Sequence, residues 1–198
     1  TLTDLAGNPL DGNGDGTGGD AYQQSFTIDL PNYKTFEGRN NNTFDTATAL
    51  SLTEDPSNSG YYYSFGLGNI DSSGDHDYWS FTAQAGDKVA ISLDTPESEL
   101  VPYLYLYNSE GSSLTSDGGG GASSDAFISS YTLTEDGTYY IKADYWYGDT
   151  GNYQLRLDLA RDIDLESDQN YNNDSISGAD PLNLTQEGNS LTTTVAGT

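Results

Sequence analysis

The sequence predicts an all-β protein, a jelly-roll-like or Greek-key β-sandwich with incomplete β segments at both ends. Short stretches of alternating apolar residues recur roughly every 8–15 residues between turns rich in Gly, Asn and Asp, which is typical of a sandwich. The chain of 198 residues holds 16 tyrosines, and tyrosine favours strands. No segment repeats its apolar residues with the period of a helix.

Eight strands are expected between residues 47 and 159. In several of them apolar and polar residues alternate, most cleanly in the last, so that one face of the strand is expected to turn toward the core. Trp79 and Phe81, for example, are expected to share the buried face of their strand. The expected strands are Ala47–Leu52, Tyr61–Phe65, Tyr78–Thr82, Lys88–Leu93, Tyr103–Tyr107, Ala126–Leu133, Thr138–Asp144 and Tyr153–Leu159.

Incomplete segments are expected on both sides of this sandwich, which should span residues 44–160. Residues 1–30 are expected to be the closing hairpin of a preceding domain, with a calcium-type loop, because so few strands cannot bury a core. Residues 31–43 are expected to be a polar linker. Residues 161–198 are expected to form a second linker and the opening strands of a similar repeat.

An internal repeat supports that last expectation. Residues 40–53 resemble residues 172–185, and a strand ending in Asp-Leu comes shortly before each. The matched residues are Asn41, Ala47, Leu50, Leu52 and Thr53 in the first copy and Asn173, Ala179, Leu182, Leu184 and Thr185 in the second. We therefore expect one unit of a tandem array, and the absence of Met even at the start favours a segment of a longer protein.

The formal net charge of −25 limits the partners that the protein can take. Six Lys and Arg residues stand against 31 Asp and Glu residues, which argues against binding nucleic acid or an anionic membrane through a basic surface. The lack of cysteine excludes disulfides and thiolate chemistry, and no apolar run reaches the length of a membrane span. So much negative charge repels itself, and bound cations relieve that repulsion.

An acidic loop near the N-terminus has the ligand spacing of a calcium loop. Asp11, Asn13 and Asp15 supply side-chain oxygens at alternate positions, and Thr17 follows with a backbone carbonyl. Asp20 is the expected substitute for the acidic residue that closes such loops. The alternative is a solvated Gly/Asp-rich hairpin turn without metal.

A second acidic loop leads into the strand at 78–82. Asp75 and Asp77 lie two residues apart and project to the same side of an extended chain, and Asp71 precedes them. No Lys or Arg is near them in sequence, so we expect Ca²⁺ to lie between these carboxylates. The alternative is that the carboxylates cap turns by accepting backbone N–H groups.

Six short motifs follow one another through the predicted sandwich. They are Asn-Asn-Thr at 41–43, Gly-Asp-His-Asp-Tyr-Trp-Ser-Phe at 74–81, Ala-Gly-Asp-Lys-Val-Ala-Ile at 85–91, Leu-Tyr-Leu-Tyr-Asn-Ser-Glu-Gly at 104–111, Asp-Gly-Thr-Tyr-Tyr-Ile-Lys at 136–142 and Gly-Asn-Tyr-Gln-Leu at 151–155. In this order they resemble the bacterial pre-peptidase C-terminal domain, which is related to the collagen-binding domain of clostridial collagenases.

The resemblance implies a jelly-roll-like sandwich that serves as a non-catalytic module of secreted enzymes and large surface proteins. It also implies a calcium ion held by four matching residues: Glu37, Asn41, Asp75 and Asp77. Arg39 stands where the collagen-binding relatives carry a further acidic ligand, and Asp71 is the residue expected to compensate. Residues 1–30 resemble the end of an immunoglobulin-like domain of large bacterial surface proteins.

Two further features bear on function. Nucleophilic catalysis has few routes because His76, expected to be a solvated loop residue, is the only histidine, so we expect no enzyme activity. Tyr145, Trp146 and Tyr147 crowd next to a turn and form a candidate ligand-binding cluster, since exposed aromatic rings stack on sugars or grip proteins. For the alternating tyrosines of the strand at 103–107, cross-strand pairing is the preferred interpretation.

The sequence therefore predicts a non-catalytic, calcium-stabilised structural module of a large extracellular or bacterial cell-surface protein. Its expected partners are other copies of itself or neighbouring repeats, joined head-to-tail by strand exchange. The alternative is an accessory module of a secreted enzyme that binds polysaccharide or fibrous protein. Neither nucleic acid nor membrane insertion is expected.

Overall fold

A computed structural model describes residues 3–9, 11–19, 21, 29–57, 60–96, 98–168, 170 and 173–197. The chain divides into two compact units, Thr1–Leu30 and Pro31–Thr198. In the described part of the first unit, a single β-bridge joins Thr3 and Pro9. Most of the strand expected before Leu30 lies outside the described residues.

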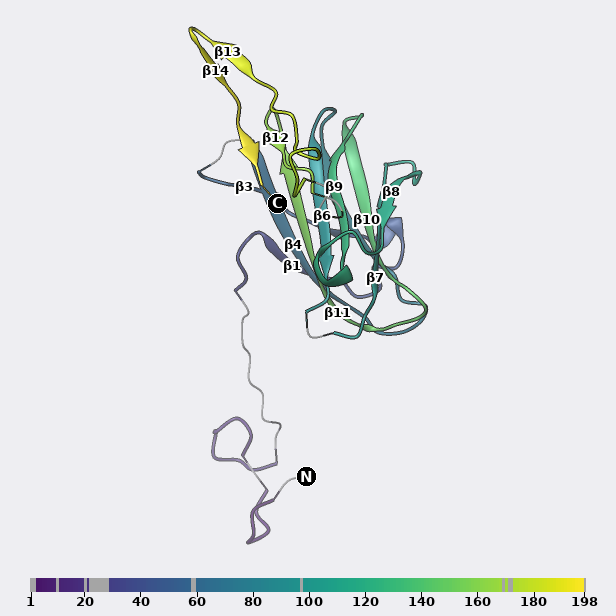
Figure 1. Cartoon of the computed structure of the whole chain (residues 1–198). Coiled ribbons are helices and arrows are strands. Elements are labelled where there is room, and N and C mark those ends of the chain that lie inside the picture. Colours follow the sequence, from purple (N-terminus) through teal and green to yellow (C-terminus); the bar gives the residue numbers. More distant parts are fainter. Residues whose placement is uncertain are drawn as a thin grey trace. The chain divides into compact units, whose positions relative to one another are not determined.

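The second unit is built on two facing sheets (Figure 1). Neighbouring strands are antiparallel except for the pairs β1–β4 and β2–β5, which are parallel. The first sheet has the order β1 (Lys34–Phe36), β4 (Tyr61–Ile70), β11 (Gly151–Ala160), β6 (Lys88–Asp94), β9 (Ala126–Thr132), with β3 (Thr53–Glu54) also on β4. The second has the order β2 (Thr48–Ala49), β5 (Asp77–Ala83), β10 (Gly137–Tyr145), β7 (Pro102–Tyr107), β8 (Ser113–Asp117). The predicted all-β sandwich is confirmed.

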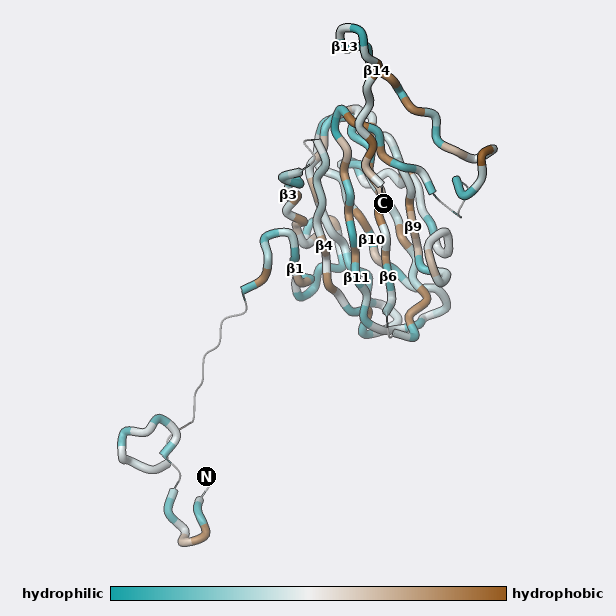
Figure 2. Tube along the Cα trace, turned by 60° about the vertical axis from the view of Figure 1, so that its left-hand side comes forward, coloured by the Kyte–Doolittle hydropathy of each residue, from teal (hydrophilic) through white to brown (hydrophobic). Residues whose placement is uncertain are grey.

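The core lies between the two sheets and is made by the alternating apolar residues of the strands (Figure 2). Trp79 and Phe81 are buried there, as their alternation predicts. Two glycines of β4 make room for the largest side chains. A Cβ at Gly68 would lie 2.2 Å from the hydroxyl of Tyr153, and one at Gly66 would lie 2.9 Å from the indole of Trp79. Any larger residue would therefore displace these rings.

The structure differs from the expected strands in three places. The strand expected at Ala47–Leu52 is shorter than expected, because the chain leaves β2 in one sheet and continues as β3 in the other. Between them, the N–H of Leu50 still donates to the carbonyl of Ser80. β1 lies inside the range expected to be a linker, whose polar composition concealed it. β8 was not expected because Leu114 is its only apolar residue. The 3₁₀ turns η1 (Phe44–Thr46) and η2 (Ala122–Ser124) complete the sandwich.

The C-terminal segment adds two small strand pairs. β12 (Asp164–Leu165) is parallel to β15 (Val195–Ala196), and β13 (Thr185–Glu187) forms a hairpin with β14 (Ser190–Thr192). Leu165 and Ala196 are buried in a small cluster with residues of β6 and β11. None of the described helices is long and apolar enough to cross a membrane.

Candidate metal centre

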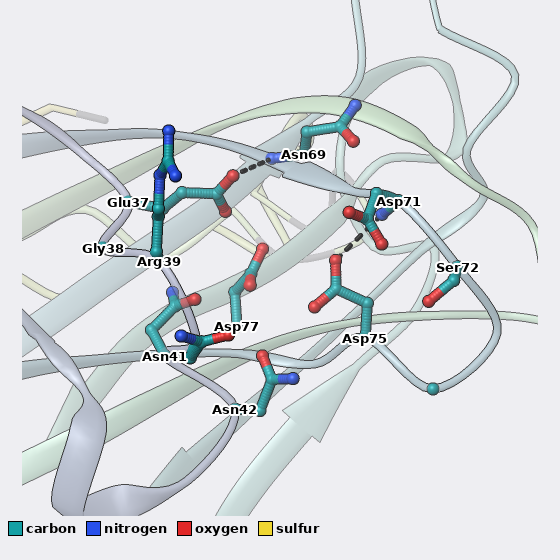
Figure 3. Close-up of a pocket in the computed structure, with 12 residues that line it drawn as sticks. Glu37, Gly38, Arg39, Asn41, Asn42, Asn69, Asp71, Ser72, Asp75 and Asp77 are labelled. Carbon is teal, nitrogen blue, oxygen red and sulfur yellow. Dashed lines mark hydrogen bonds between the residues drawn. The ribbon is translucent and has the colours of Figure 1, made fainter.

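The parallel pairing of β1 with β4 creates an acidic hollow of about 620 Å³ beside the start of β5. The chain leaves β1 with the N–H of Glu37 on the carbonyl of Leu67, and it then passes β5, where the N–H of Tyr78 donates to the carbonyl of Asn41. Figure 3 shows the carboxylates that face this space. All five residues predicted for the second calcium site line it: Glu37, Asn41, Asp71, Asp75 and Asp77.

Asp77 is the most deeply placed of these carboxylates, with 1% of its surface exposed. Its Oδ2 accepts a hydrogen bond of 2.7 Å from the hydroxyl of Tyr153, which in turn accepts one of 3.0 Å from Nε1 of Trp79. The bottom of the hollow is thus tied to the core by a buried chain of three side chains. Burial and, after it, the charge of Asp77 raise the pKa of Tyr153 well above its usual value. This hydroxyl therefore stays protonated as a donor.

Glu37 lies across from Asp77 with its hydrogen-bonding capacity half used. Its Oε1 accepts the N–H of Asn69 at 3.1 Å, whereas its Oε2 is buried with no hydrogen-bond partner. Burial, the adjoining Glu37 carboxyl and the negative charge of Asp75 raise the pKa of Asp77 to about 8. Two carboxyl groups this close either share a proton or hold a cation.

Asn41 provides the third group at this point. It is buried, and one end of its side-chain amide lies 2.9 Å from the carbonyl oxygen of Gly38 and 3.0 Å from Oδ1 of Asp77. With its nitrogen on that side, the amide donates to both oxygens. With its oxygen on that side, the three groups present only oxygens, the ligands that Ca²⁺ prefers. The donor set therefore fits a hard cation, held by Glu37, Asp77, Asn41 and the carbonyl of Gly38.

The other predicted ligands have different roles. Asp75 accepts the N–H of Asp71 at 2.9 Å, so this carboxylate closes its own loop, as the turn-capping alternative describes. Among the described residues, no three His, Asp or Glu side chains form a group suited to a metal, and Arg39 makes no ion pair. A cation here would have two acidic ligands, with the remainder supplied by amide and backbone oxygens.

The N-terminal loop is arranged differently. The carboxylate of Asp11 accepts the N–H groups of Gly14, Asp15 and Gly16, the last at 2.7 Å. Asp15 accepts the N–H of Thr17 at 2.7 Å and the side-chain amide of the nearby asparagine at 3.2 Å. These donors lower the pKa of Asp11 and of Asp15, so both stay ionised without a cation. Asp20, predicted to complete this site with Asp11, Asn13, Asp15 and Thr17, lies outside the described residues.

His76 is a partly exposed loop residue, as the sequence predicts, and the negative charge that holds it is that of Asp144. Its Nδ1 lies 3.0 Å from Oδ1 of Asp144, and its ring stacks on Tyr145 at a centroid distance of 5.6 Å. The Nζ of Lys142 contacts the other oxygen of Asp144 at 2.5 Å. Sequence reasoning missed this cluster because β10 brings in its carboxylate from 68 residues away.

The aromatic residues at 145–147 have different neighbours, although the rings of Trp146 and Tyr147 meet edge to face with centroids 5.6 Å apart. Tyr145 turns its hydroxyl to the carbonyl of Ser73 at 2.6 Å, and Tyr147 is 92% exposed. Trp146 instead stacks on Tyr103, with ring centroids 4.9 Å apart and planes 13° from parallel. From there, ring contacts continue along β7 through Tyr105 to Tyr107 and end on Phe44.

Comparisons with known proteins address the family. Residues 75–144 match the family model described as bacterial pre-peptidase C-terminal domain. No curated protein sequence is significantly similar to the chain.

Three solved structures are similar to the chain at low identity. The pre-peptidase C-terminal domain of collagenase from Bacillus anthracis is 12% identical, with a TM-score of 0.44, over 56% of this chain and 93% of that one. PliG from Aeromonas hydrophila, a periplasmic inhibitor of g-type lysozyme, is 9% identical, with a TM-score of 0.43, over 64% of this chain and 98% of that one. PliG from Salmonella Typhimurium is 16% identical, with a TM-score of 0.35, over 57% and 99%. The family-model match over residues 75–144 confirms the resemblance to the bacterial pre-peptidase C-terminal domain that the motifs predict.

Proposed function

We propose that this protein is a non-catalytic, calcium-stabilised structural module of an extracellular protein, joined head-to-tail to neighbouring repeats or copies by strand exchange. The observation that carries the calcium part is the buried pair of Glu37 and Asp77, with one carboxylate oxygen lacking any partner. A buried oxygen without a donor destabilises the fold, and a bound cation removes that cost.

The charge of the chain supports the same proposal. Four of the six basic residues, in β6, β10 and β11 and just after β11, already pair with aspartates outside the hollow. Of the other two, Arg39 lines the hollow but makes no ion pair among the described residues, so a net charge of −25 still favours a solvent cation there. Extracellular calcium is present at millimolar concentration, the range in which extracellular calcium modules are tuned.

Catalysis is not part of the proposal. Nδ1 of His76 faces Asp144, and no described hydrogen bond joins its ring to a serine or threonine hydroxyl. The residues that would activate a nucleophile are therefore not assembled around it.

The test is thermal unfolding of the chain in calcium and in EDTA. A ligand held at about 1,000 times its Kd stabilises the folded state by about 4 kcal/mol. For a protein of this size that shifts the melting temperature by roughly 8–16 °C, so we expect EDTA to lower it by more than about ten degrees. Isothermal titration calorimetry should detect calcium binding to protein from which EDTA has removed the calcium and from which the EDTA has then been removed. Identical melting curves in both buffers would contradict the proposal.

A second candidate function is an accessory module that binds polysaccharide or fibrous protein. The observation that favours it is the row of stacked rings from Trp146 along β7, since Trp146 is 44% exposed at its open end. A pull-down on insoluble polysaccharides and on collagen should then retain the chain and lose Trp146→Ala. Phe36→Ala is the matched control, because Phe36 is 53% exposed on the other sheet. Equal retention of both variants would contradict this function.

A further inference from the structure

The apolar side chains of the internal repeat are covered in its first copy and exposed in its second copy. In the first copy, Phe44 contacts three tyrosine rings of β5, β7 and β10 at centroid distances of 4.8–5.3 Å. Leu50 is 6% exposed, and Leu52 packs against the same core. Backbone pairing of β2 with β5 and of β3 with β4 fixes the segment on the sandwich.

In the second copy the matching apolar side chains are uncovered. Ile176, which matches Phe44, is 99% exposed, and Leu182 and Leu184, which match Leu50 and Leu52, are 59% and 53% exposed. The contacts that the described part of this segment makes are polar. Asn173 Nδ2 donates to Glu166, the N–H of Ser167 donates to Asp180, and both the N–H and the Nδ2 of Asn183 donate to Asp164. Thr185, at the end of the segment, pairs with Thr192 in the hairpin of β13 and β14.

The first copy shows which surface fits this pattern. Phe44 packs against the tyrosines of one sheet. Leu50 and Leu52, two residues apart, pack on the core between the two sheets. Exposed aliphatic side chains in this register gain free energy on meeting the same surface. A second sandwich of this type has that surface.

We propose that residues 173–185 are a docking segment, which packs on a second sandwich of this type in the place that residues 41–53 occupy here. This inference rests on the proposed function as a serial module and names its partner. Within one chain, residues 41–53 are tethered beside their place at a high effective concentration, so they exclude a segment from another molecule. Docking therefore requires a partner whose place is open.

The test opens that place by mutation in the full chain. Leu50→Ser with Leu52→Ser weakens the resident segment, and the docking segment of another molecule should then bind. We expect the weight-average mass, measured by light scattering, to rise about twofold or more over a roughly hundredfold increase in concentration. The wild type should stay at constant mass over the same range.

The matched control adds Leu182→Ser and Leu184→Ser to that variant, which should return it to constant mass. Association of this fourfold variant to the same extent, or a constant mass of the double variant, would overturn the proposal. If the double variant does not fold, a graft decides. Replacing residues 41–53 with the sequence of 173–185 should give a melting temperature nearer to wild type than a scrambled graft gives, and equal melting of both grafts would overturn the proposal. The calcium response of the wild type is measured separately, so a failed docking test leaves the calcium-stabilised module standing and removes only this way of joining repeats.

Discussion

The two acidic sites have similar residues but opposite electrostatics. In the N-terminal loop, Asp11 and Asp15 accept N–H groups from within their own turn, and their pKa values are lowered. In the hollow beside β5, Glu37 and Asp77 come from distant segments, one oxygen has no partner, and the pKa of Asp77 is raised to about 8. Backbone donors alone satisfy the first site, whereas the second needs either a shared proton or a cation.

The spacing of carboxylates along the sequence therefore does not by itself identify a cation site. A carboxylate saturated by backbone donors is stable as an anion, so a cation adds little to it. A buried carboxylate pair without donors is unstable as two anions, so a cation adds much. The hollow is therefore expected to account for most of the calcium response.

The largest expected effect separates the two sites by mutation. In Glu37→Gln with Asp77→Asn, the difference in melting temperature between calcium and EDTA should nearly vanish. In Asp11→Asn with Asp15→Asn, the matched control, it should remain above about ten degrees for the sandwich. Calorimetry in both buffers measures this. If the control variant loses the response instead, the N-terminal loop is the calcium site and the comparison is reversed.

The next effect is a pH dependence that appears without calcium. The pKa of Asp77 is about 8 in the folded protein against 3.8 as the ordinary value, so between these limits the folded state holds a proton that the unfolded state lacks. In EDTA the unfolding free energy should therefore fall as pH rises from about 4 to about 8, by at most roughly 1.4 kcal/mol per unit.

Calcium should change this dependence, because a calcium ion bound at the pair would replace the shared proton. Denaturant titrations at several pH values should show the fall in EDTA and a much smaller one in saturating calcium. Asp77→Asn should show the smaller fall in both buffers. Parallel slopes for the wild type with and without calcium would mean that no cation reaches Asp77.

The fold was predictable because period-two alternation is clear in core strands such as β5 and β7. Strand ends were harder to predict. The strand expected at Tyr61–Phe65 continues to Ile70. The sequence does not reveal this, because Gly66 and Gly68 resemble turn residues. In the structure both lie in β4, where they leave room for the side chains of Trp79 and Tyr153. These glycines are required by large side chains on other strands, and the residues next to a glycine in the sequence do not reveal such contacts.

The site was predictable only in part, for the same reason. Asp75 and Asp77 follow from spacing, and Glu37 from resemblance. The hydroxyl of Tyr153 was not expected, since it reaches Asp77 across 76 residues of sequence. The pairing of His76 with Asp144 was missed in the same way. Long-range partners decide whether a carboxylate is satisfied, and the sequence around it does not contain them.

A smaller effect is expected when the one donor to Asp77 from the core is removed. Tyr153→Phe leaves Asp77 without this hydrogen bond and Nε1 of Trp79 without its acceptor. Loss of a buried partner costs about 1–3 kcal/mol, which denaturant titration measures. Tyr131→Phe is the control, because no described hydrogen bond involves that hydroxyl, and it should change stability by less than about 0.5 kcal/mol. Equal effects of the two variants would show that the buried chain does not support the hollow.

The smallest effect tests the self-satisfied loop on its own. The carboxylate of Asp11 accepts the N–H of Gly16 at 2.7 Å, and this bond is the leading cause of its lowered pKa. Because the folded pKa lies below 3.8, the bond is fully present above that value and is lost as pH falls through the lowered pKa. The amide proton shift of Gly16, followed by NMR in EDTA, should therefore titrate with a midpoint below 3.8. In Asp11→Asn this titration should disappear, whereas Asp15→Asn should leave it and alter Thr17 instead. A midpoint at or above 3.8 in the wild type would show that the backbone donors of this loop do not stabilise its ionised carboxylate in the absence of a cation.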